Sequence, residues 1–335
     1  MLSKITVSHA PHIAKSYSTQ SIMLDVILAL CPAMLAGMWF FRHYAVVLLV
    51  ACIGSCMLTE WACNWIRRKS NTLDDFSAIV TGILLAMSLP PALPFWAGII
   101  GSVFAIAVGK MVFGGLGCNV FNPAMIGRAF LTASFGTLMT TWTVPAPLDA
   151  QMPALRPDST VAVTQATPLA WSKEAIKGKA EPSVVVAQRG DAFIGRVGGC
   201  LGETSALAML IGGVYLLIRG TISWHIPVSV LLAATICAAI GWLINPDRFV
   251  SPEVHILAGG MLMGVFFIAT DPVTAPLTGK GMLIFGMGVG ALTMLIRMVG
   301  EYPEGVMYAV LIMNAFTPLI DRFCKRIPAG GKGNG

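Results

Sequence analysis

The feature that most constrains the fold of this chain is a series of long apolar segments. One of them, HYAVVLLVACIGSCML at residues 43–58, contains no lysine, arginine or carboxylate. Runs of about 20 predominantly apolar residues match the hydrocarbon core that a transmembrane helix has to cross. Hydrophobic residues make up 56% of the sequence and charged residues 11%, whereas soluble domains average about 25% charged residues. We therefore predict an all-α polytopic membrane protein, since the alternating pattern of a membrane β-barrel is absent from the sequence.

The apolar segments predict about ten transmembrane helices. The first begins at Ile22, and because the stretch from Met1 to Gln20 is polar, we expect no cleaved signal peptide. The ten expected spans lie near residues 22–41, 44–66, 76–90, 95–113, 123–142, 203–219, 224–244, 253–270, 281–299 and 304–321.

The distribution of lysine and arginine predicts the orientation of these spans, because cytoplasmic loops carry an excess of both residues. With the N-terminus inside, thirteen basic residues fall in inside segments and three in short outside loops. The net charge of +6 is therefore a topology signal, and we expect no nucleic-acid partner. The inside residues are Lys4, Lys15, Arg67, Arg68, Lys69, Lys110, Arg128, Arg219, Lys280, Arg322, Lys325, Arg326 and Lys332, and the outside residues are Arg42, Arg248 and Arg297.

The remaining six basic residues lie in a long polar loop, residues 143–202, in which five carboxylates offset them. Long loops cross a membrane largely regardless of their charge. We therefore expect this loop outside and both termini in the cytoplasm.

The expected spans divide into two sets of five, at residues 1–142 and 203–323, followed by a cytoplasmic tail at 324–335. Because each set holds an odd number of spans, the two repeats have to be inverted. The third span, FSAIVTGILLAMSLPP, is short, and the eighth, HILAGGMLMGVFFIATDP, is interrupted by glycine; both end in proline. Such paired interruptions indicate a midplane pathway for an ion or small solute. The alternative, that glycine pairs such as Gly260 and Gly264 or Gly286 and Gly290 only let helices approach closely, stays open.

A glycine-rich stretch, GKMVFGGLGCNVFNPAMIGRAFL at residues 109–131, lies between the fourth and fifth spans. Gly114, Gly115 and Gly117 allow backbone conformations that other residues resist. Asn119 and Asn122 offer amide groups that can hydrogen-bond a heterocycle. From the residues alone, a tight cytoplasmic turn before Pro123 is the simpler interpretation.

Ionisable residues inside the spans are candidates for a functional role, because each costs roughly 2.5–3.5 kcal/mol at the centre of a helix. For Asp25, Glu60, Lys110 and Arg128 we expect pairing with one another near the cytoplasmic interface. Asp271 is different, because it ends the interrupted eighth span. A carboxylate beside unwound backbone carbonyls suits a Na⁺ or proton site, although Asp271 could equally cap the turn at the following proline.

The motifs together resemble one family. The stretch GKxxFGGxGxNxFNPAxxGRAFL, a polar loop that contains an Ala-Thr pair, and the later FFIATDPV are similar to the D subunit of the Rnf complex, an ion-translocating ferredoxin:NAD oxidoreductase. The B subunit of sodium-pumping NADH:quinone reductase is a relative and remains an alternative. The short segment before the first span suits the Rnf protein better. The resemblance extends over essentially the whole chain.

The resemblance implies a cofactor in the outside loop. Members of the family carry FMN, joined by a phosphoester bond to the last threonine of an S-G-A-T type motif. The matching residues here are Thr164, Gln165, Ala166 and Thr167, with threonine and glutamine at the first two positions. The resemblance thus implies FMN on Thr167, attached by a flavin transferase, and a second, non-covalent riboflavin. Without the resemblance, Thr167 before Pro168 would be interpreted as an ordinary start of a turn or helix.

The resulting prediction is an electron-carrying subunit of a redox-driven Na⁺ or H⁺ pump in a bacterial cytoplasmic (inner) membrane, in contact with lipid and with other subunits of an Rnf-type complex. NAD itself should bind elsewhere in the complex, because no G-x-G-x-x-G follows a strand. The eight cysteines form no CxxC pair and suit apolar packing, although an iron centre shared with a partner subunit stays open. A passive inverted-repeat channel or transporter and a flavin-free scaffold are the rival hypotheses.

Overall fold

The computed structural model describes residues 18–143, 167–178, 189–195, 197–300, 302 and 304–325, and this part of the chain is helical. Several of its helices are long and apolar enough to cross a membrane. The prediction of a polytopic all-α membrane protein is therefore confirmed. The long apolar helices are α1 (Thr19–Phe41), α2 (His43–Ile66), α11 (His225–Ile244), α14 (Gly279–Met298) and α15 (Val306–Phe323).

Other expected spans are shorter than a bilayer. Helix α3 (Ser77–Met87) has 11 residues, or about 16 Å at 1.5 Å per residue, against a hydrocarbon core of about 30 Å. Helix α5 (Pro123–Ser134) ends well before residue 142, because Phe135 leaves the helical conformation at φ −129° and ψ 45°. The remaining short elements are η1 (Leu73–Asp75), α4 (Phe95–Ile106), which continues as the π-helix η2 (Ala107–Met111), α6 (Gly136–Met139), η3 (Leu201–Glu203) and α10 (Ala206–Arg219).

The expected eighth span is interrupted by glycine, as the sequence predicts. It consists of α12 (Pro252–Leu257), α13 (Met261–Met263) and the π-helix η4 (Gly264–Ile268), with the break at residues 258–260. Gly259 has a φ of +69°, which residues with a side chain rarely adopt. The helix is thus broken near its middle and irregular in its second half.

The close-approach interpretation of the glycines is confirmed at several positions. A side chain added at Gly264 would collide with Val306, and one added at Gly286 would collide with Ser229. A side chain at Gly290 would meet the backbone of Val230. These glycines let α11 pack against α14, and the η4 segment against α15.

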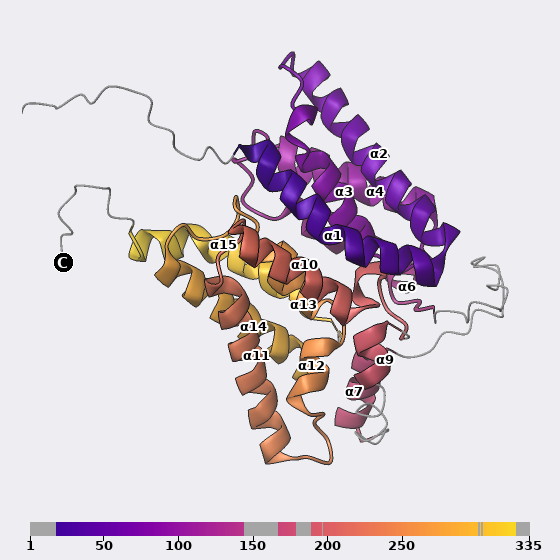
Figure 1. The fold of residues 1–335 in the computed structure, drawn as a ribbon, viewed down its shortest axis with the longest axis vertical. Coiled ribbons are helices and arrows are strands. Elements are labelled where there is room, and N and C mark those ends of the chain that lie inside the picture. The colour runs from indigo at the N-terminus through magenta and orange to yellow at the C-terminus, as the bar shows by residue number, and fades with distance from the viewer. Residues whose placement is uncertain are drawn as a thin grey trace, which may run out of the picture.

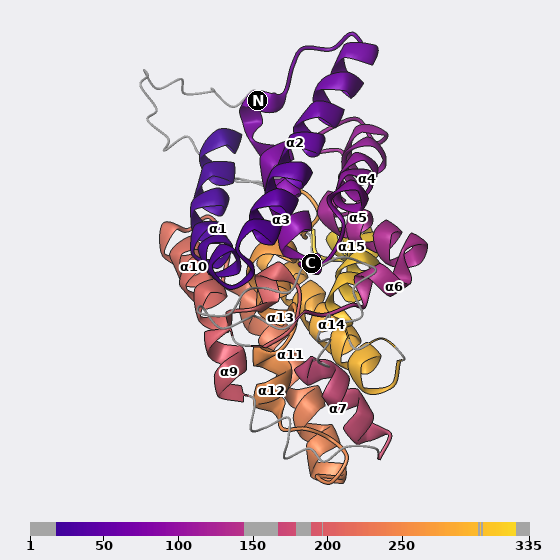
Figure 2. The same cartoon turned by 90° about the vertical axis from the view of Figure 1, so that its right-hand side faces the viewer.

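The helices form two groups that meet along a central boundary (Figures 1 and 2). In the first group α2 packs against α3 and α4, and in the second α14 packs against α11 and α15. Across the boundary α1 lies against α10, and α5 against α15. Helices at corresponding places in the two halves of the chain thus pair with each other. The number of spans and the inversion of the repeats stay predictions.

Two helices of the predicted outside loop rest on the second group. Helix α7 (Pro168–Ile176) packs against α14, and α9 (Arg189–Ile194) against α10 and α12 (Figure 1). Leu169 of α7 is buried with Val250, Val254 and Ala258. Most of the expected loop, including Thr164, lies outside the described residues. The part that carries Thr167 is fixed to the helices.

Candidate functional site

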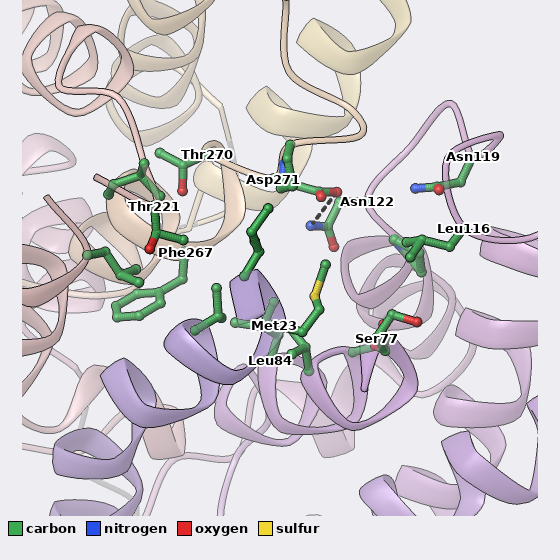
Figure 3. A pocket seen from close by; sticks show the side chains of 18 of the residues that line it. Met23, Ser77, Leu84, Leu116, Asn119, Asn122, Thr221, Phe267, Thr270 and Asp271 are labelled. Atoms are coloured by element: carbon green, nitrogen blue, oxygen red, sulfur yellow. Dashed lines mark hydrogen bonds between the residues drawn. The ribbon is translucent and has the colours of Figure 1, made fainter. Parts of the chain in front are cut away.

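Three of the predicted site residues, Asn119, Asn122 and Asp271, line a cavity at the boundary between the two groups of helices, hereafter the central cavity (Figure 3). It encloses about 700 Å³ with its open mouth included. Its walls come from α1, α3, η2 and the glycine-rich loop on one side, and from α10, η4 and the segment after η4 on the other. The polar lining residues are Ser77, Thr81, Lys110, Asn119, Asn122, Thr221, Thr270 and Asp271.

Asn122 connects the two halves of the chain. It is the N-cap of α5, where its Oδ1 accepts a hydrogen bond of 3.3 Å from the backbone N–H of Met125. Its Nδ2 lies 3.5 Å from Oδ2 of Asp271 and donates toward it (Figure 3). The cap fixes the amide oxygen and thereby directs the amide nitrogen at the carboxylate.

Asp271 fulfils one of the two roles that the sequence leaves open, that of turn cap, and its role in an ion path stays a prediction. Its carboxylate accepts hydrogen bonds from the backbone N–H of Val273 at 3.3 Å and from Oγ1 of Thr274 at 3.1 Å, as a turn-capping residue does. The same carboxylate lines the central cavity and faces Asn122. It follows directly on the irregular helix η4, where the backbone unwinds.

Asn119 presents an unused acceptor. The residue is 5% exposed, and its Nδ2 donates to the carbonyl of Phe121 at 3.2 Å. Its buried Oδ1 has no hydrogen-bond partner among the described residues. A buried polar atom without a partner costs roughly 1–3 kcal/mol. The arrangement favours a ligand that donates a hydrogen bond into the cavity.

The three glycines shape the loop rather than line the central cavity. Gly114, Gly115 and Gly117 have φ values of +131°, +112° and +90°, a region that glycine adopts without steric cost. Leu116 between them lines the central cavity. Gly114 and Gly115 face a second, polar hollow beside Asn64 and Lys69, which Leu116 also borders.

A buried ion pair stands beside the cavity. Lys110 is 1% exposed, and its ammonium donates to the Glu60 carboxylate and to the Ser77 hydroxyl, each at 2.6 Å. Thr72 donates a further hydrogen bond to Glu60. A buried pair needs such additional partners to offset the loss of hydration. The expected pairing of Glu60 with Lys110 is confirmed.

The expected pairing is wrong for the other two charges. Asp25 on α1 binds Arg219 of the second half, with Nη2 3.1 Å from Oδ1. Arg128 on α5 lies 2.5 Å from the carboxylate of Glu304, which directly precedes α15 of the second half. Both pairs join residues far apart in the chain, which no local pattern in the sequence indicates.

Arg128 belongs to a buried charged cluster that sequence reasoning missed. Its Nη2 also lies 3.8 Å from Glu203 and 3.4 Å from Sγ of Cys200. Ligand atoms of Cys200, Glu203 and Glu304 approach within 4.8 Å of one another, a spacing that could hold a metal ion. The guanidinium of Arg128 occupies this position with its own positive charge, so the group is an ion-pair network.

The same cluster stabilises the break in the eighth span. Arg297 of α14 donates to the carbonyl oxygens of His255 and Ala258, at 2.5 and 3.3 Å. Glu304 accepts from the backbone N–H of Gly260 at 2.8 Å. A cation thus lies at the C-terminal end of α12 and a carboxylate at the N-terminal end of the next segment, as the helix dipole favours. Arg297, which the charge count assigns to an outside loop, lies in the last turn of α14 and is 2% exposed.

Thr167 lies at the N-terminus of α7. It is the N-cap, 7% exposed, and its Oγ1 accepts from the backbone N–H of Ala170 at 3.1 Å. It is not part of the central cavity lining. Thr164, Gln165 and Ala166 lie outside the described residues, so the choice between the two threonines stays a prediction.

Similarity to known proteins identifies the family of this chain. The model of the NQR2, RnfD, RnfE family matches residues 6–330. This chain belongs to that family. It is 46% identical to the D subunit of the Na⁺-translocating ferredoxin:NAD⁺ oxidoreductase complex of Acetobacterium woodii, over 96% of this chain and 94% of that protein. The D subunits of the ion-translocating oxidoreductase complexes of Pectobacterium atrosepticum and Escherichia coli are 40% and 38% identical, each over 95% of this chain and over 97% and 96% of their own lengths.

Membership of the NQR2, RnfD, RnfE family confirms the resemblance drawn from the motifs. Of the sequence-predicted site residues, the fold brings Asn119, Asn122 and Asp271 together and leaves Thr167 apart. The charged cluster around Arg128 is the feature that only the fold reveals.

Proposed function

We propose that this chain is the electron-carrying membrane subunit of a redox-driven pump, which moves Na⁺ or H⁺ while electrons pass between ferredoxin and NAD. The full-length similarity to D subunits of ion-translocating oxidoreductase complexes carries this proposal. The chain works with partner subunits that deliver and accept the electrons. It is a multi-pass membrane protein, and we place it in a bacterial cytoplasmic membrane with both termini inside, on the strength of the basic residues in its short loops.

The electron carrier is FMN on Thr167. A phosphate on Oγ1 of this N-cap would lie at the positive end of α7, where first-turn N–H groups stabilise an anion. A threonine hydroxyl is a weak nucleophile, so a flavin transferase has to form the bond. When bound, the flavin supplies the redox chemistry. The tether keeps its local concentration high, on the order of mM for a short linker.

The central cavity takes the non-covalent riboflavin. The unused acceptor of Asn119 matches an N–H group of a flavin ring, and the amide of Asn122 matches its carbonyl edge. Gly114, Gly115 and Gly117 hold the loop so that Leu116 and Asn119 form one wall.

The ion path passes Asp271. Its carboxylate stands beside the amide of Asn122, and the hydroxyls of Thr81 and Thr270 border the same cavity. Hard cations prefer oxygen ligands of these kinds. The position at the end of an irregular helix, where two halves of the chain meet, is the one that ion-coupled transporters use.

The outer helix faces supply the contacts to lipid and to the other subunits. Trp39, Trp61, Trp65 and Leu243 are each more than half exposed on the described chain. Such exposed apolar area has to be covered by lipid or protein.

Ion uptake into liposomes tests the function. The complete complex is reconstituted, supplied with reduced ferredoxin and NAD⁺, and assayed for ²²Na⁺ uptake with and without a protonophore. A Na⁺ pump accumulates ²²Na⁺ even in the presence of the protonophore. An H⁺ pump acidifies the lumen, and the pH gradient collapses when the protonophore is added. Electron transfer that moves neither ion would contradict the proposal. A complex with Thr167→Ala is the matched control and should move neither.

A further inference from the structure

A fully buried asparagine in the last helix leaves its polar groups unused. Asn314 of α15 is 0% exposed, and neither its Oδ1 nor its Nδ2 has a hydrogen-bond partner among the described residues. Buried side-chain amides almost always have partners, so an amide with none indicates a bound water or ion. We propose that Asn314 is a binding site for the transported cation, either Na⁺ or a proton carried by a water molecule. The inference rests on the proposed ion pumping, and it adds a site that the sequence does not single out.

The backbone adds an oxygen beside the amide. Pro318 lies inside α15 and has no N–H, so the carbonyl of Asn314, four residues earlier, lacks its helical donor. A helical carbonyl points toward the residue four positions on, so this oxygen points toward Pro318 and its neighbour Thr317. Asn314 therefore offers a side-chain oxygen and a backbone oxygen that the helix itself leaves free.

These groups match a cation that keeps part of its water. Amide and backbone carbonyl oxygens bind Na⁺ at interrupted helices in transporters, and the amide nitrogen of Asn314 can donate to a water molecule on the cation. The site carries no charge of its own. A neutral site binds a cation weakly enough to release it, which transport requires.

A series of hydrogen-bonded groups connects Asn314 with the central cavity. Asp271 accepts from Oγ1 of Thr274 at 3.1 Å, and the carbonyl of Thr274 accepts from Oγ1 of Thr317 at 3.0 Å. Thr317 follows Asn314 by three residues, and side chains at that spacing lie on the same face of a helix. A cation thus meets oxygen atoms at each step from Asp271 to Asn314.

On the other side of Asn314 the same helix face is apolar. Val310 and Met307 precede Asn314 by four and seven residues on this face, and both are buried. Seven residues of helix are about 10 Å long, and beyond them lies Glu304 with its partner Arg128. The series of oxygen atoms therefore ends at Asn314, before an apolar barrier. An ion that arrives from the central cavity is held there until the helices move.

The neighbouring element is irregular at the same depth. Gly264 at the start of the π-helix η4 lies against Val306, and Thr274 beyond its end lies against Thr317. The two elements thus run in the same direction, and Asn314 lies between these two contacts. π-Helical turns occur often at functional sites. The helix that carries the site and the helix beside it are therefore both interrupted.

Two substitutions remove the two kinds of ligand separately. Asn314→Leu replaces the amide by an apolar side chain of similar size. Pro318→Ala supplies an N–H for the Asn314 carbonyl, and because Pro318 is exposed and the helix gains a hydrogen bond, this variant should fold at least as well as the wild type. The matched controls are Thr293→Val, whose buried hydroxyl is bonded to Val289 of its own helix, and Pro32→Ala, which replaces a proline inside α1.

The assay measures NAD⁺ reduction by the complete complex in liposomes, with Na⁺ varied as NaCl at constant ionic strength and pH varied separately. Flavin fluorescence of the denatured subunit is measured in parallel. We expect the half-maximal concentration of the transported ion to rise at least about threefold in Asn314→Leu and in Pro318→Ala, because each loses a ligand to the ion. Both controls should keep the wild-type value, and all four variants should keep their flavin.

An unchanged ion dependence in both variants, with pumping and flavin content intact, would overturn the inference and leave the proposed function standing. Asn314 would then hold only a structural water. A shift of the same size in the controls would also overturn it, because any disturbance of helix packing would then produce the effect. If Asn314→Leu does not assemble, Pro318→Ala decides alone. A wild-type complex that moves neither ion would instead remove the proposed function, and with it this inference.

Discussion

Replacing Asp271 by asparagine separates its two roles, turn cap and ion ligand. Asparagine keeps the size and one carbonyl-type oxygen, and it can still accept from the backbone N–H of Val273. The second oxygen becomes an NH₂ group, which faces the NH₂ group of Asn122. Asn122 cannot turn its amide around without giving up the cap on Met125. The substitution therefore removes one charge and one hydrogen bond between the halves, and the Thr274 hydroxyl, which donates to the same oxygen, has to turn and accept instead.

The two losses differ in size. The contact with Asn122 is 3.5 Å long, so its loss should cost near the low end of about 0.5–1.5 kcal/mol. A cation about 4 Å from a carboxylate gains about 4 kcal/mol at an effective permittivity near 20. Much of this gain offsets the lost hydration of the ion. A remaining loss of about 1.4 kcal/mol still raises the ion concentration for half-maximal turnover about tenfold.

The assay is NAD⁺ reduction by the reconstituted complex as a function of Na⁺ concentration and, separately, of pH, with the flavin content measured in parallel. We expect about a tenfold rise in the half-maximal ion concentration with flavins retained. Asp74→Asn is the matched control, because this substitution makes the same chemical change at an exposed site on the predicted cytoplasmic side. An unchanged ion dependence with normal coupling would remove Asp271 from the ion path and leave Thr81 and Thr270 as candidates.

Three further predictions concern topology, the glycine-rich loop and the charged cluster. A reporter that is active only outside the cytoplasm should work when fused near Trp171 and fail after Lys325, and the opposite pattern would refute the orientation. Gly115→Val should lower the riboflavin content of an assembled complex, because a φ of +112° is strained for a residue with a side chain. Gly54→Val is the control and should retain the riboflavin, because an added side chain there also has open space and the φ of Gly54 is not in the positive region. The same riboflavin content in both variants would return the loop to a purely structural role. Glu304→Ala takes from the buried Arg128 guanidinium its nearer carboxylate, leaving only Glu203 at 3.8 Å, and should destabilise the protein by up to about 3–5 kcal/mol, measured as a lower midpoint of thermal unfolding; an unchanged midpoint would contradict the described network.

The sequence predicts the helical class and much of the interrupted span, because both depend on local patterns. Apolar runs identify the long helices, and glycines with a terminal proline identify the break in the eighth span. The predicted end of α5 was wrong. The apolar pattern continues beyond Ser134, whereas the helix ends at Phe135 through a change of backbone conformation that hydropathy does not register.

Contacts between the halves could not be predicted in the same way. Asn122 and Asp271 are each conspicuous in the sequence, yet their contact joins positions 149 residues apart. The pair of Arg128 with Glu304 spans 176 residues. An ion pair of this kind follows from how helices pack across the boundary, and no local spacing encodes it. Glu60 and Lys110 were predictable because adjacent spans bring them to the same depth.

The proposed function depends above all on a flavin carried by Thr167. The direct measurement is flavin fluorescence of the denatured chain in a gel, after production in a host that has the flavin transferase, with the mass of the peptide around Thr167 as confirmation. We expect a fluorescent wild-type band, a fluorescent Thr164→Ala band and a dark Thr167→Ala band from a complex that still assembles, since loss of the N-cap alone costs about 0.5–2 kcal/mol. A dark wild-type band, or a dark Thr164→Ala band beside a fluorescent Thr167→Ala band, would contradict the claim.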